Sequence, residues 1–305
     1  MVTAPDALDA RFGIDRLVRF DAGDGGLTRL VVTNEHADAH VYLHGAHVTH
    51  YQPCGQPAVL FMSERTEYAT DRPIRGGVPV IFPWFGLNAA DKTLPLHGFA
   101  RGREWVVQDV ARRESDGAVV ATFVLHALAH PPASWPHKFA LTYAVAVGRA
   151  LEMSLTVRNE GKVPIRFEEA LHPYFLIGDI RRIAIRGLTG TTFSDKTRNF
   201  VSVVDEADPL TFARTTDRVY QHTRATVTID DPVIGRRIVV EKDASDTTVV
   251  WNPWEQPAEA RPADLGFDEW ERFVCVEAAN ARDHAITLAP GAEHTMTQRV
   301  RTEAM

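Results

Sequence analysis

The chain has 305 residues, of which 45% are hydrophobic and 24% are charged, and its formal net charge is −7 at pH 7. These proportions are typical of a soluble globular protein and exclude a disordered or fibrous chain. Acidic and basic residues are scattered rather than grouped in blocks of one sign. This disfavours nucleic acid and an anionic membrane surface as partners, but it is compatible with one small anion held by a local arginine site.

The N-terminal segment and the cysteines bear on the cellular compartment. The first 13 residues have neither a basic start nor an apolar stretch of signal-peptide length, and no run approaches the ~20 apolar residues that span a bilayer. Cys54 and Cys275 are too few for a disulfide framework and fit a reducing compartment. We therefore expect a cytoplasmic protein without membrane partners, whose oligomeric state, a monomer included, stays open.

Most of the chain shows the period-two alternation that is typical of β-strands. In chain order, β-rich runs cover residues 26–34, 118–128, 139–147, 151–157, 181–188, 225–230, 236–242, 246–252, 272–279 and 284–290. The third and fourth runs flank Gly148 and Arg149 and are predicted to form a hairpin. Long helical periodicity is missing, and only residues 263–272 predict a short helical turn.

Many strands at short spacing, without alternating helices, predict an all-β sandwich or barrel. No linker rich in proline, glycine or serine divides the chain, and no repeat of roughly 20–50 residues is present. We expect one β domain over residues 1–305, with Met1 to Asp9 loose at its end.

Four segments break the strand pattern with clustered polar, aromatic and proline residues. They are residues 74–86 (IRGGVPVIFPWFG), 96–101 (LHGFAR), 168–175 (EEALHPYF) and 273–280 (FVCVEAAN). Glycines permit a close approach of two backbones, and prolines fix the local geometry. These segments are therefore the candidates for chemistry.

The last two segments place ionisable residues among apolar ones. On a strand, Phe273, Cys275 and Glu277 share one face, so Glu277 ends an apolar row in which burial would raise the pKa of its carboxyl. If their segment is extended, Glu168 and His172 share a face as well. A histidine and a glutamate brought together in this setting could transfer protons near neutral pH.

Each candidate also has a purely structural interpretation when it is taken alone. A buried histidine is more often a hydrogen-bonded core residue than a catalyst, and a buried Glu277 could simply pair with an arginine. Arg75 and Arg101 could likewise be ordinary surface or structural arginines. Composition and periodicity alone therefore lead no further than a β protein with some buried polar groups.

A metal site is a further possibility because four histidines lie close together in the sequence: His40, His44, His47 and His50. At this spacing their side chains would converge only on a helix, and the β-rich surroundings disfavour one. We expect solvated or locally hydrogen-bonded histidines and no metal.

Taken together, the four segments and their neighbours resemble the aldose 1-epimerase superfamily, specifically its hexose-6-phosphate mutarotases (glucose-6-phosphate 1-epimerases). The matching motifs, in the order of the family, are HGAHVTHYQP, VLFMSE, IRGGVPVIFPWFG, LPLHGFARGREW, ALHPYF, GLTGTTFSDK, TTDRVY, WNPW and FVCVEAAN. The resemblance implies a galactose-mutarotase-like supersandwich of large, mostly antiparallel sheets with the sugar bound on a concave face.

The resemblance also implies roles for individual residues. His172 in ALHPYF and Glu277 in VCVEAAN would form the catalytic acid–base pair, and Arg75 and Arg101 would hold the phosphate of the substrate. To change the anomer, a base removes the proton of the C1 hydroxyl while an acid protonates the ring oxygen, and the open form closes again after rotation about C1–C2. Glu277 is expected as the base and His172, entering protonated, as the acid, with both pKa values near neutrality. Neither a cofactor nor a metal is required.

Less specific roles follow for other residues of the motifs. His97 in HGFAR and Asp217 in TTDRVY resemble contacts to substrate hydroxyls or to the ring oxygen. Some relatives carry a polar residue immediately before the HGFAR histidine, whereas this chain has Leu96, so a third polar phosphate contact would have to come from elsewhere. Four aromatic residues could form an apolar floor for the sugar or pack in the core: Trp84, Phe85, Trp251 and Trp254.

Several alternative functions can be weighed against these residues. A glycoside hydrolase needs two carboxylates, for instance among Glu168, Glu169 and Glu277, but this leaves His172 and both arginines without roles. An aldose 1-epimerase for free hexoses would not need the arginines, and a non-catalytic carbohydrate-binding or sensor protein would not need the acid–base pair. The residues and the resemblance together therefore predict an isomerase that interconverts the anomers of a hexose 6-phosphate, with a small sugar phosphate as its partner. The resemblance implies glucose 6-phosphate as that substrate.

Overall fold

The computed structural model describes residues 4–127 and 130–305. Within these ranges it contains one α-helix, α1 (Pro5–Phe12), and five short 3-10 helices. The latter are η1 (Asp24–Gly26), η2 (Ala100–Gly102), η3 (Lys196–Arg198), η4 (Glu269–Arg272) and η5 (Arg282–His284). Of the part of the chain that is described, no helix is both long and apolar enough to cross a membrane.

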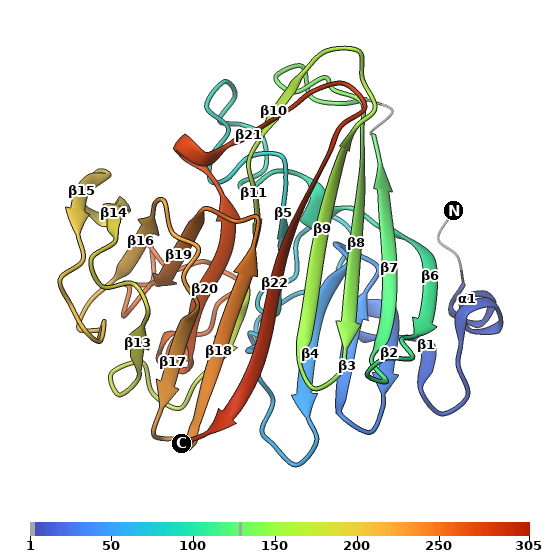
Figure 1. Ribbon diagram of the computed structural model, residues 1–305, viewed down its shortest axis with the longest axis horizontal. Helices are drawn as coiled ribbons and strands as arrows, with labels where there is room; N and C mark the ends of the chain where they lie inside the picture. Colours follow the sequence, from blue (N-terminus) through green and yellow to red (C-terminus); the bar gives the residue numbers. More distant parts are fainter. Residues whose placement is uncertain (1–3, 128–129) are drawn as a thin grey trace.

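The strands form large antiparallel sheets (Figure 1). A four-stranded sheet runs in chain order through β1 (Val18–Ala22), β2 (Thr28–Thr33), β3 (Ala37–Tyr42) and β4 (His47–Pro53). The long eight-stranded sheet has the order β13 (Ala184–Arg186), β17 (Val227–Asp231), β18 (Arg236–Asp243), β22 (Glu293–Ala304), β9 (Leu151–Asn159), β8 (Phe139–Val147), β7 (Val119–His126) and β6 (Val106–Arg112).

A second eight-stranded sheet carries the residues of the candidate site. Its order is β15 (Val201–Val204), β14 (Thr192–Asp195), β16 (Thr216–Tyr220), β19 (Thr247–Asn252), β20 (Phe273–Asn280), β11 (Glu169–Leu171) and β5 (Val80–Ile81), and β12 (Tyr174–Leu176) also pairs with β20. The strands β10 (Ile165–Phe167) and β21 (Ile286–Leu288) form a separate pair.

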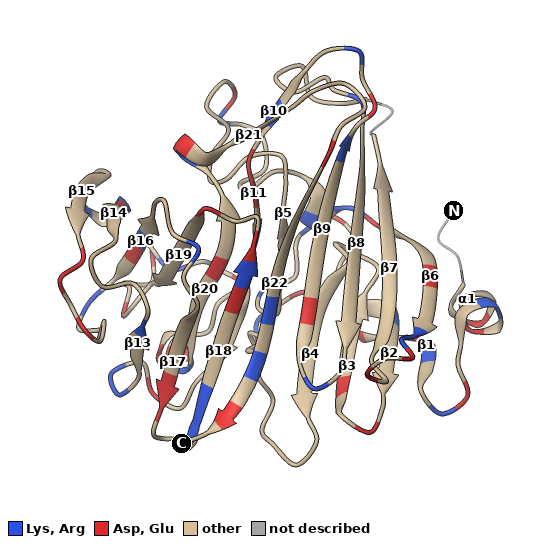
Figure 2. Cartoon of the chain, in the orientation of Figure 1, with Lys and Arg blue, Asp and Glu red and all other residues tan. Residues whose placement is uncertain are grey.

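The four-stranded sheet and the second eight-stranded sheet both pack against the long sheet. Strand β3 contacts β8, and β20 contacts β22. Alternate residues of each strand point into the space between the layers, so that one apolar core extends from Leu8 near the N-terminus to Val300 on β22. Figure 2 shows that lysine and arginine are interspersed with aspartate and glutamate over strands and loops.

The structure confirms the predicted all-β class, and each predicted β-rich run contains a strand. The predicted hairpin is present, because Val147 pairs with Leu151 across the turn. Within residues 263–272, regular helical structure is confined to the 3-10 helix η4.

The N-terminal segment differs from the expectation of a loose end. Residues 1–3 lie outside the described ranges, but α1 begins at Pro5, in the first turn, where a proline is well tolerated. Leu8 and Phe12, four residues apart on one helix face, are buried against the core, and the Asp9 carboxylate accepts a hydrogen bond of 2.8 Å from the backbone N–H of Phe20. These contacts attach the helix to the sheet.

Candidate active site

Strand β20 has one face in the core and the other toward a cleft. Val274 and Val276 belong to the large apolar core, whereas Cys275 packs in a separate small cluster on the opposite face. Glu277 shares the face of Cys275 and lines a cleft of about 690 Å³. The division of faces predicted from strand parity is therefore confirmed.

A row of side chains crosses the sheet on the cleft face. The strand register places Asp217 on β16, Trp251 on β19, Cys275 on β20 and Tyr174 on β12 side by side. Directly paired residues of antiparallel strands point to the same face. Since β16 and β12 are three strand spacings apart, the two ends of this row are separated by about 14 Å.

The two candidate catalytic side chains meet in the middle of the cleft. The Nε2 atom of His172 lies 3.2 Å from Oε1 of Glu277, and both residues are almost fully buried. His172 follows β11 and is held by its backbone N–H, which donates to the carbonyl of Pro79 at 3.1 Å. Among the described residues, Nδ1 of His172 and Oε2 of Glu277 have no hydrogen-bond partner. Each residue of the pair therefore has one hydrogen-bonding atom that could serve a ligand.

Burial shifts the two pKa values in opposite directions. It raises the pKa of Glu277 well above its ordinary range, against the attraction of the nearby Lys196 ammonium group. It lowers the pKa of His172, and the positive charges of Arg101 and Arg75 lower it further. Without a ligand, the pair therefore favours a protonated Glu277 and a neutral His172. The physical reason is that a buried imidazolium would be poorly solvated and close to the positive charges of the two arginines. The protonation state with substrate bound stays a prediction.

Arg75 lies at the Tyr174 end of the cleft. Its Nη1 atom donates to the Tyr174 hydroxyl at 2.9 Å, and its Nη2 atom lies 3.0 Å from Oδ1 of Asp264. Tyr174 and then Asp264 raise the pKa of Arg75 above its ordinary value. The glycines after Arg75 permit the close approach predicted from the sequence, since a Cβ atom on Gly77, at φ +58°, would lie 2.3 Å from the carbonyl oxygen of Val48.

Arg101 lies on η2 and reaches the same cleft. Its Nη2 atom donates to the carbonyl of Leu96 at 2.7 Å. Burial lowers the pKa of Arg101 to about 10, with a further contribution from the charge of Arg75, so the guanidinium stays positive at neutral pH. Among the described residues, the Nε atoms of both arginines have no hydrogen-bond partner. Both arginines line the cleft, and the charge of Arg75 acts on the pKa of Arg101.

His97 also lines the cleft, and its hydrogen bond identifies its tautomer. The backbone N–H of Gly86 donates to Nδ1 of His97 at 3.2 Å. Burial and the charge of Arg101 lower the pKa of His97 well below its ordinary value. The ring is therefore neutral with its proton on Nε2, which can donate to an oxygen of a ligand. Its edge meets the ring of His172, with 5.8 Å between the two centroids.

The predicted residue Asp217 lies at the opposite end from Arg75 and has a partner that the sequence did not single out. Nζ of Lys196 is 2.7 Å from Oδ2 of Asp217, and both side chains line the cleft. The signal for Lys196 was its place at the end of the motif GLTGTTFSDK, but nothing in that string indicates the contact with β16. Tyr174 and Asp264, the partners of Arg75, were likewise not assigned from the sequence.

The four aromatic candidates divide into two groups. Phe85 and Trp251 line the cleft, as an apolar floor requires. Trp84 packs edge-on against Phe99 and donates from its indole to the carbonyl of Pro95, and Trp254 packs against Trp270. Trp84 therefore belongs to the apolar core, and Trp254 packs against that core.

Two of the four clustered histidines hydrogen-bond with backbone carbonyls, and the other two pack against each other. Nε2 of His44 hydrogen-bonds with the carbonyl of Arg72, and Nε2 of His47 with that of Gly76, each at 2.8 Å. The rings of His40 and His50 lie against each other with 4.9 Å between centroids. Within residues 4–127 and 130–305, no group of three or more histidine, cysteine or acidic residues is arranged to hold a metal ion.

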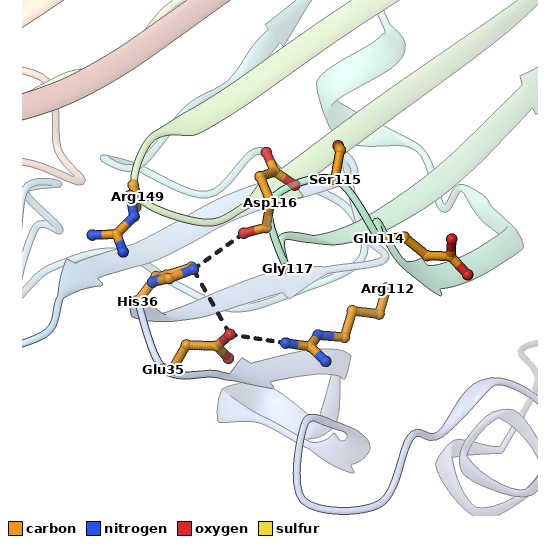
Figure 3. A pocket seen from close by; sticks show the side chains of 8 residues that line it. All are labelled: Glu35, His36, Arg112, Glu114, Ser115, Asp116, Gly117 and Arg149. Carbon is orange, nitrogen blue, oxygen red and sulfur yellow. Dashed lines mark hydrogen bonds and ion pairs between the residues drawn. The ribbon is translucent and has the colours of Figure 1, made fainter.

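A second hollow, at the β6–β7 turn, has a different character (Figure 3). Its charged groups contact one another: Arg112 donates to Glu35 at 2.9 Å, and Nε2 of His36 lies 3.2 Å from the carbonyl oxygen of Asp116. The cleft on β20 instead contains several buried polar atoms without partners. The cleft is therefore the candidate active site.

The family model named Aldose 1-epimerase matches residues 28–301, which include all six predicted site residues. The chain belongs to the aldose 1-epimerase family. This confirms the resemblance found in the motifs, and it implies a small-molecule sugar as the partner of this family member.

Similar proteins agree with the family assignment. Provisionally named glucose-6-phosphate 1-epimerases of Salmonella typhimurium and Escherichia coli are each 36% identical, over 84% of this chain and 84% of their own lengths. A crystal structure of a provisionally named mutarotase from Salmonella typhimurium is 30% identical, with a TM-score of 0.87 over 96% of both chains. A galactose mutarotase-like protein from Clostridium acetobutylicum shares the fold at 13% identity, with a TM-score of 0.72 over 94% of this chain and 98% of its own.

Proposed function

We propose that this member of the aldose 1-epimerase family interconverts the α and β anomers of a hexose 6-phosphate, with glucose 6-phosphate as the preferred substrate, and uses no cofactor. The observation that carries the proposal is the His172–Glu277 contact of 3.2 Å in a cleft that is also lined by the half-buried Arg75 and Arg101. The names of the relatives at 36% identity support the same substrate.

The two arginines supply the selectivity for a phosphate ester. Guanidinium groups form paired, charge-assisted hydrogen bonds with phosphate oxygens and stay charged at neutral pH. Arg75 already holds Asp264 and the Tyr174 hydroxyl, which orient its side chain, and its Nε atom is available. Binding energy from the phosphate would fix the sugar ring against the acid–base pair.

The bound phosphate also affects the protonation of the His172–Glu277 pair. Arg101 is the strongest charged contributor that lowers the pKa of His172, but it contributes less to the pKa of Glu277 than Lys196 does. A dianion bound at Arg101 would offset its charge and raise the pKa of His172. This favours the imidazolium that acts as the acid, beside the Glu277 carboxylate that acts as the base.

Catalysis then needs only two proton transfers in each direction. Glu277 takes the proton of the C1 hydroxyl while His172 protonates the ring oxygen, the bond between C1 and that oxygen breaks, and C1 becomes the carbonyl carbon of the open aldehyde. After rotation about C1–C2, the C5 hydroxyl attacks the other face of the carbonyl. His172 takes the hydroxyl proton and Glu277 protonates the new C1 oxygen. The Nε2–H of His97 provides a further hydrogen bond to the sugar.

Exchange NMR between the anomers of glucose 6-phosphate tests the proposal, with free glucose at the same concentration as the comparison. We expect the protein to accelerate exchange of the phosphate ester and to leave free glucose near its spontaneous rate. Equal acceleration of both sugars would indicate an aldose 1-epimerase for free hexoses instead. Binding of glucose 6-phosphate without any acceleration would indicate a carbohydrate-binding or sensor protein.

A further inference from the structure

Lys196 is a cation of the cleft that lowers the pKa of Glu277 but takes part in neither proton transfer. It lies in η3, directly after β14, and β14 pairs with β16, the strand that carries Asp217. The Asp195 carboxylate caps this turn by accepting from the backbone N–H of Thr197 at 3.0 Å and from its hydroxyl at 2.6 Å. The Lys196 ammonium group also lies 5.7 Å from the centre of the Phe85 ring. The fold therefore fixes the position of Lys196.

The location of this lysine relative to the arginines decides which part of a sugar it can reach. Asp217 and Tyr174 are at opposite ends of a row that spans about 14 Å across the sheet. Arg75 contacts Tyr174, and Lys196 contacts Asp217. Glu277, on β20, lies between these ends. The cleft is thus cationic at the Arg75 end and has a mixed donor and acceptor pair at the other end.

Between the Arg75 end and the Asp217 end of the cleft, a hexose 6-phosphate fits in only one orientation. Its phosphate, on C6, faces the arginines, and the ring oxygen and C1 must face the His172–Glu277 pair. Around the ring, the order of atoms from that phosphate is C6, C5, ring oxygen, C1, C2 and C3. The hydroxyls at C2 and C3 therefore point toward Asp217 and Lys196.

We infer that Lys196 is a further residue that recognises the sugar. It holds Asp217, the hydroxyl contact that the family resemblance implies, in place and donates to the C2 or C3 hydroxyl. The inference rests on the proposed function. Oδ2 of Asp217 is occupied by Lys196, whereas the buried Oδ1 has no partner among the described residues. Lys196 uses one of its three ammonium protons on Asp217, and the others are available to a neighbouring hydroxyl.

The ion pair also opposes the effect of burial on the Asp217 carboxylate. Burial raises the pKa of Asp217, and the contact with Lys196 opposes this shift. Without the ammonium group, Asp217 would hold a proton more readily and would lose an acceptor for the sugar. The lysine is therefore a positioning residue, and its loss should affect substrate binding more than the chemical step.

Steady-state exchange NMR with Lys196→Met, Lys196→Arg and the wild-type protein tests this inference. The substrates are glucose 6-phosphate and its 2-deoxy and 3-deoxy derivatives. Lys162→Met, at an exposed lysine in the turn after β9, is the matched control and should behave as the wild type does. For glucose 6-phosphate, Lys196→Met should raise KM about tenfold with a smaller change in kcat, as expected for the loss of charged hydrogen bonds. Lys196→Arg should bring KM most of the way back to the wild-type value.

The deoxy substrates separate recognition from a general structural effect. The wild-type KM should be higher for at least one deoxy derivative than for glucose 6-phosphate. For that derivative, Lys196→Met should raise KM by at most about a further twofold, because the hydrogen bond to the missing hydroxyl is already lost. A KM for glucose 6-phosphate that is unchanged in Lys196→Met, or an equal rise for all three substrates, would overturn the inference while the proposed function stands. A wild-type protein that accelerates none of the substrates would instead refute the proposed function itself.

Discussion

Replacing Glu277 with glutamine separates proton transfer from substrate binding. The two side chains have nearly the same shape, and the amide can keep the 3.2 Å contact with His172. The amide cannot accept and return a proton, so both the opening and the closing of the ring lose one of their two catalysts. Because neither arginine contacts Glu277 directly, binding of the phosphate ester should change little.

The expected loss can be bounded from general acid–base catalysis. One positioned group contributes roughly 10²–10⁴-fold, which corresponds to about 2.7–5.4 kcal/mol of activation free energy. Stability should move in the opposite direction. The folded-state pKa of Glu277 is raised, so the wild-type carboxyl destabilises the fold increasingly as the pH rises above the pKa of the unfolded chain toward the folded value. Glutamine removes this cost, and the variant should melt at or above the wild-type temperature at neutral pH.

The assay combines anomer exchange by NMR, binding of glucose 6-phosphate by calorimetry, and thermal unfolding. Glu169→Gln is the matched control. Glu169 is equally buried on β11, but its carboxylate lies on the other face and contacts His294 at 2.9 Å. This control should lose stability and keep the exchange rate. If Glu277→Gln keeps more than a tenth of the wild-type rate, or if it unfolds at a clearly lower temperature, the reasoning about its role and its burial is wrong.

Other changes test the phosphate site, the backbone and the pH dependence. Arg101→Ala should raise KM for glucose 6-phosphate at least about tenfold and leave any weak action on free glucose unaltered, whereas equal losses would exclude a phosphate role. Gly98→Ala should cost at least about 1–3 kcal/mol in denaturant unfolding, because φ is +76° and a Cβ atom would lie 2.0 Å from the carbonyl oxygen of Phe82; Gly102→Ala, with open space around it, is the control. The hydrogen bond to Glu169 raises the pKa of His294, so its stabilising contribution is present below the unfolded pKa and is lost as the pH rises through the folded one. The difference in melting temperature between the wild type and His294→Gln should therefore shrink from about pH 6 to about pH 8, and a constant difference would contradict this.

The electrostatic field of the cleft also bears on selectivity. Burial lowers the pKa of His172, and the same arginines that suit a phosphate lower it further while the cleft is empty. A free hexose would leave those charges in place and would meet a protonated Glu277 and a neutral His172. Selectivity for the phosphate ester would then arise in the proton transfer as well as in binding.

Local patterns in the chain were sufficient for the strands and for the faces of individual strands. The alternation in residues 151–157 predicts a strand that the structure contains, and the parity of Cys275 and Glu277 correctly separates the cleft face of β20 from the core face. Such patterns work because successive side chains of a strand point to opposite sides whatever the strand pairs with. The ordered motifs then indicated the family, and the match of the family model to residues 28–301 confirms it.

The contacts that make a site depend instead on which strands become neighbours. His172 and Glu277 are far apart in the chain and meet because β11 and β12 both pair with β20. Lys196 was missed for the same reason, since only the pairing of β14 with β16 brings it to Asp217. The pKa shifts follow from burial and from charges assembled by several strands and loops, so the parity of β20 indicates the direction for Glu277, whereas the lowered pKa of His172 depends on burial and on arginines that only the fold brings near it. Long-range pairing is set by the packing of the whole sheet, and only the tertiary structure decides it.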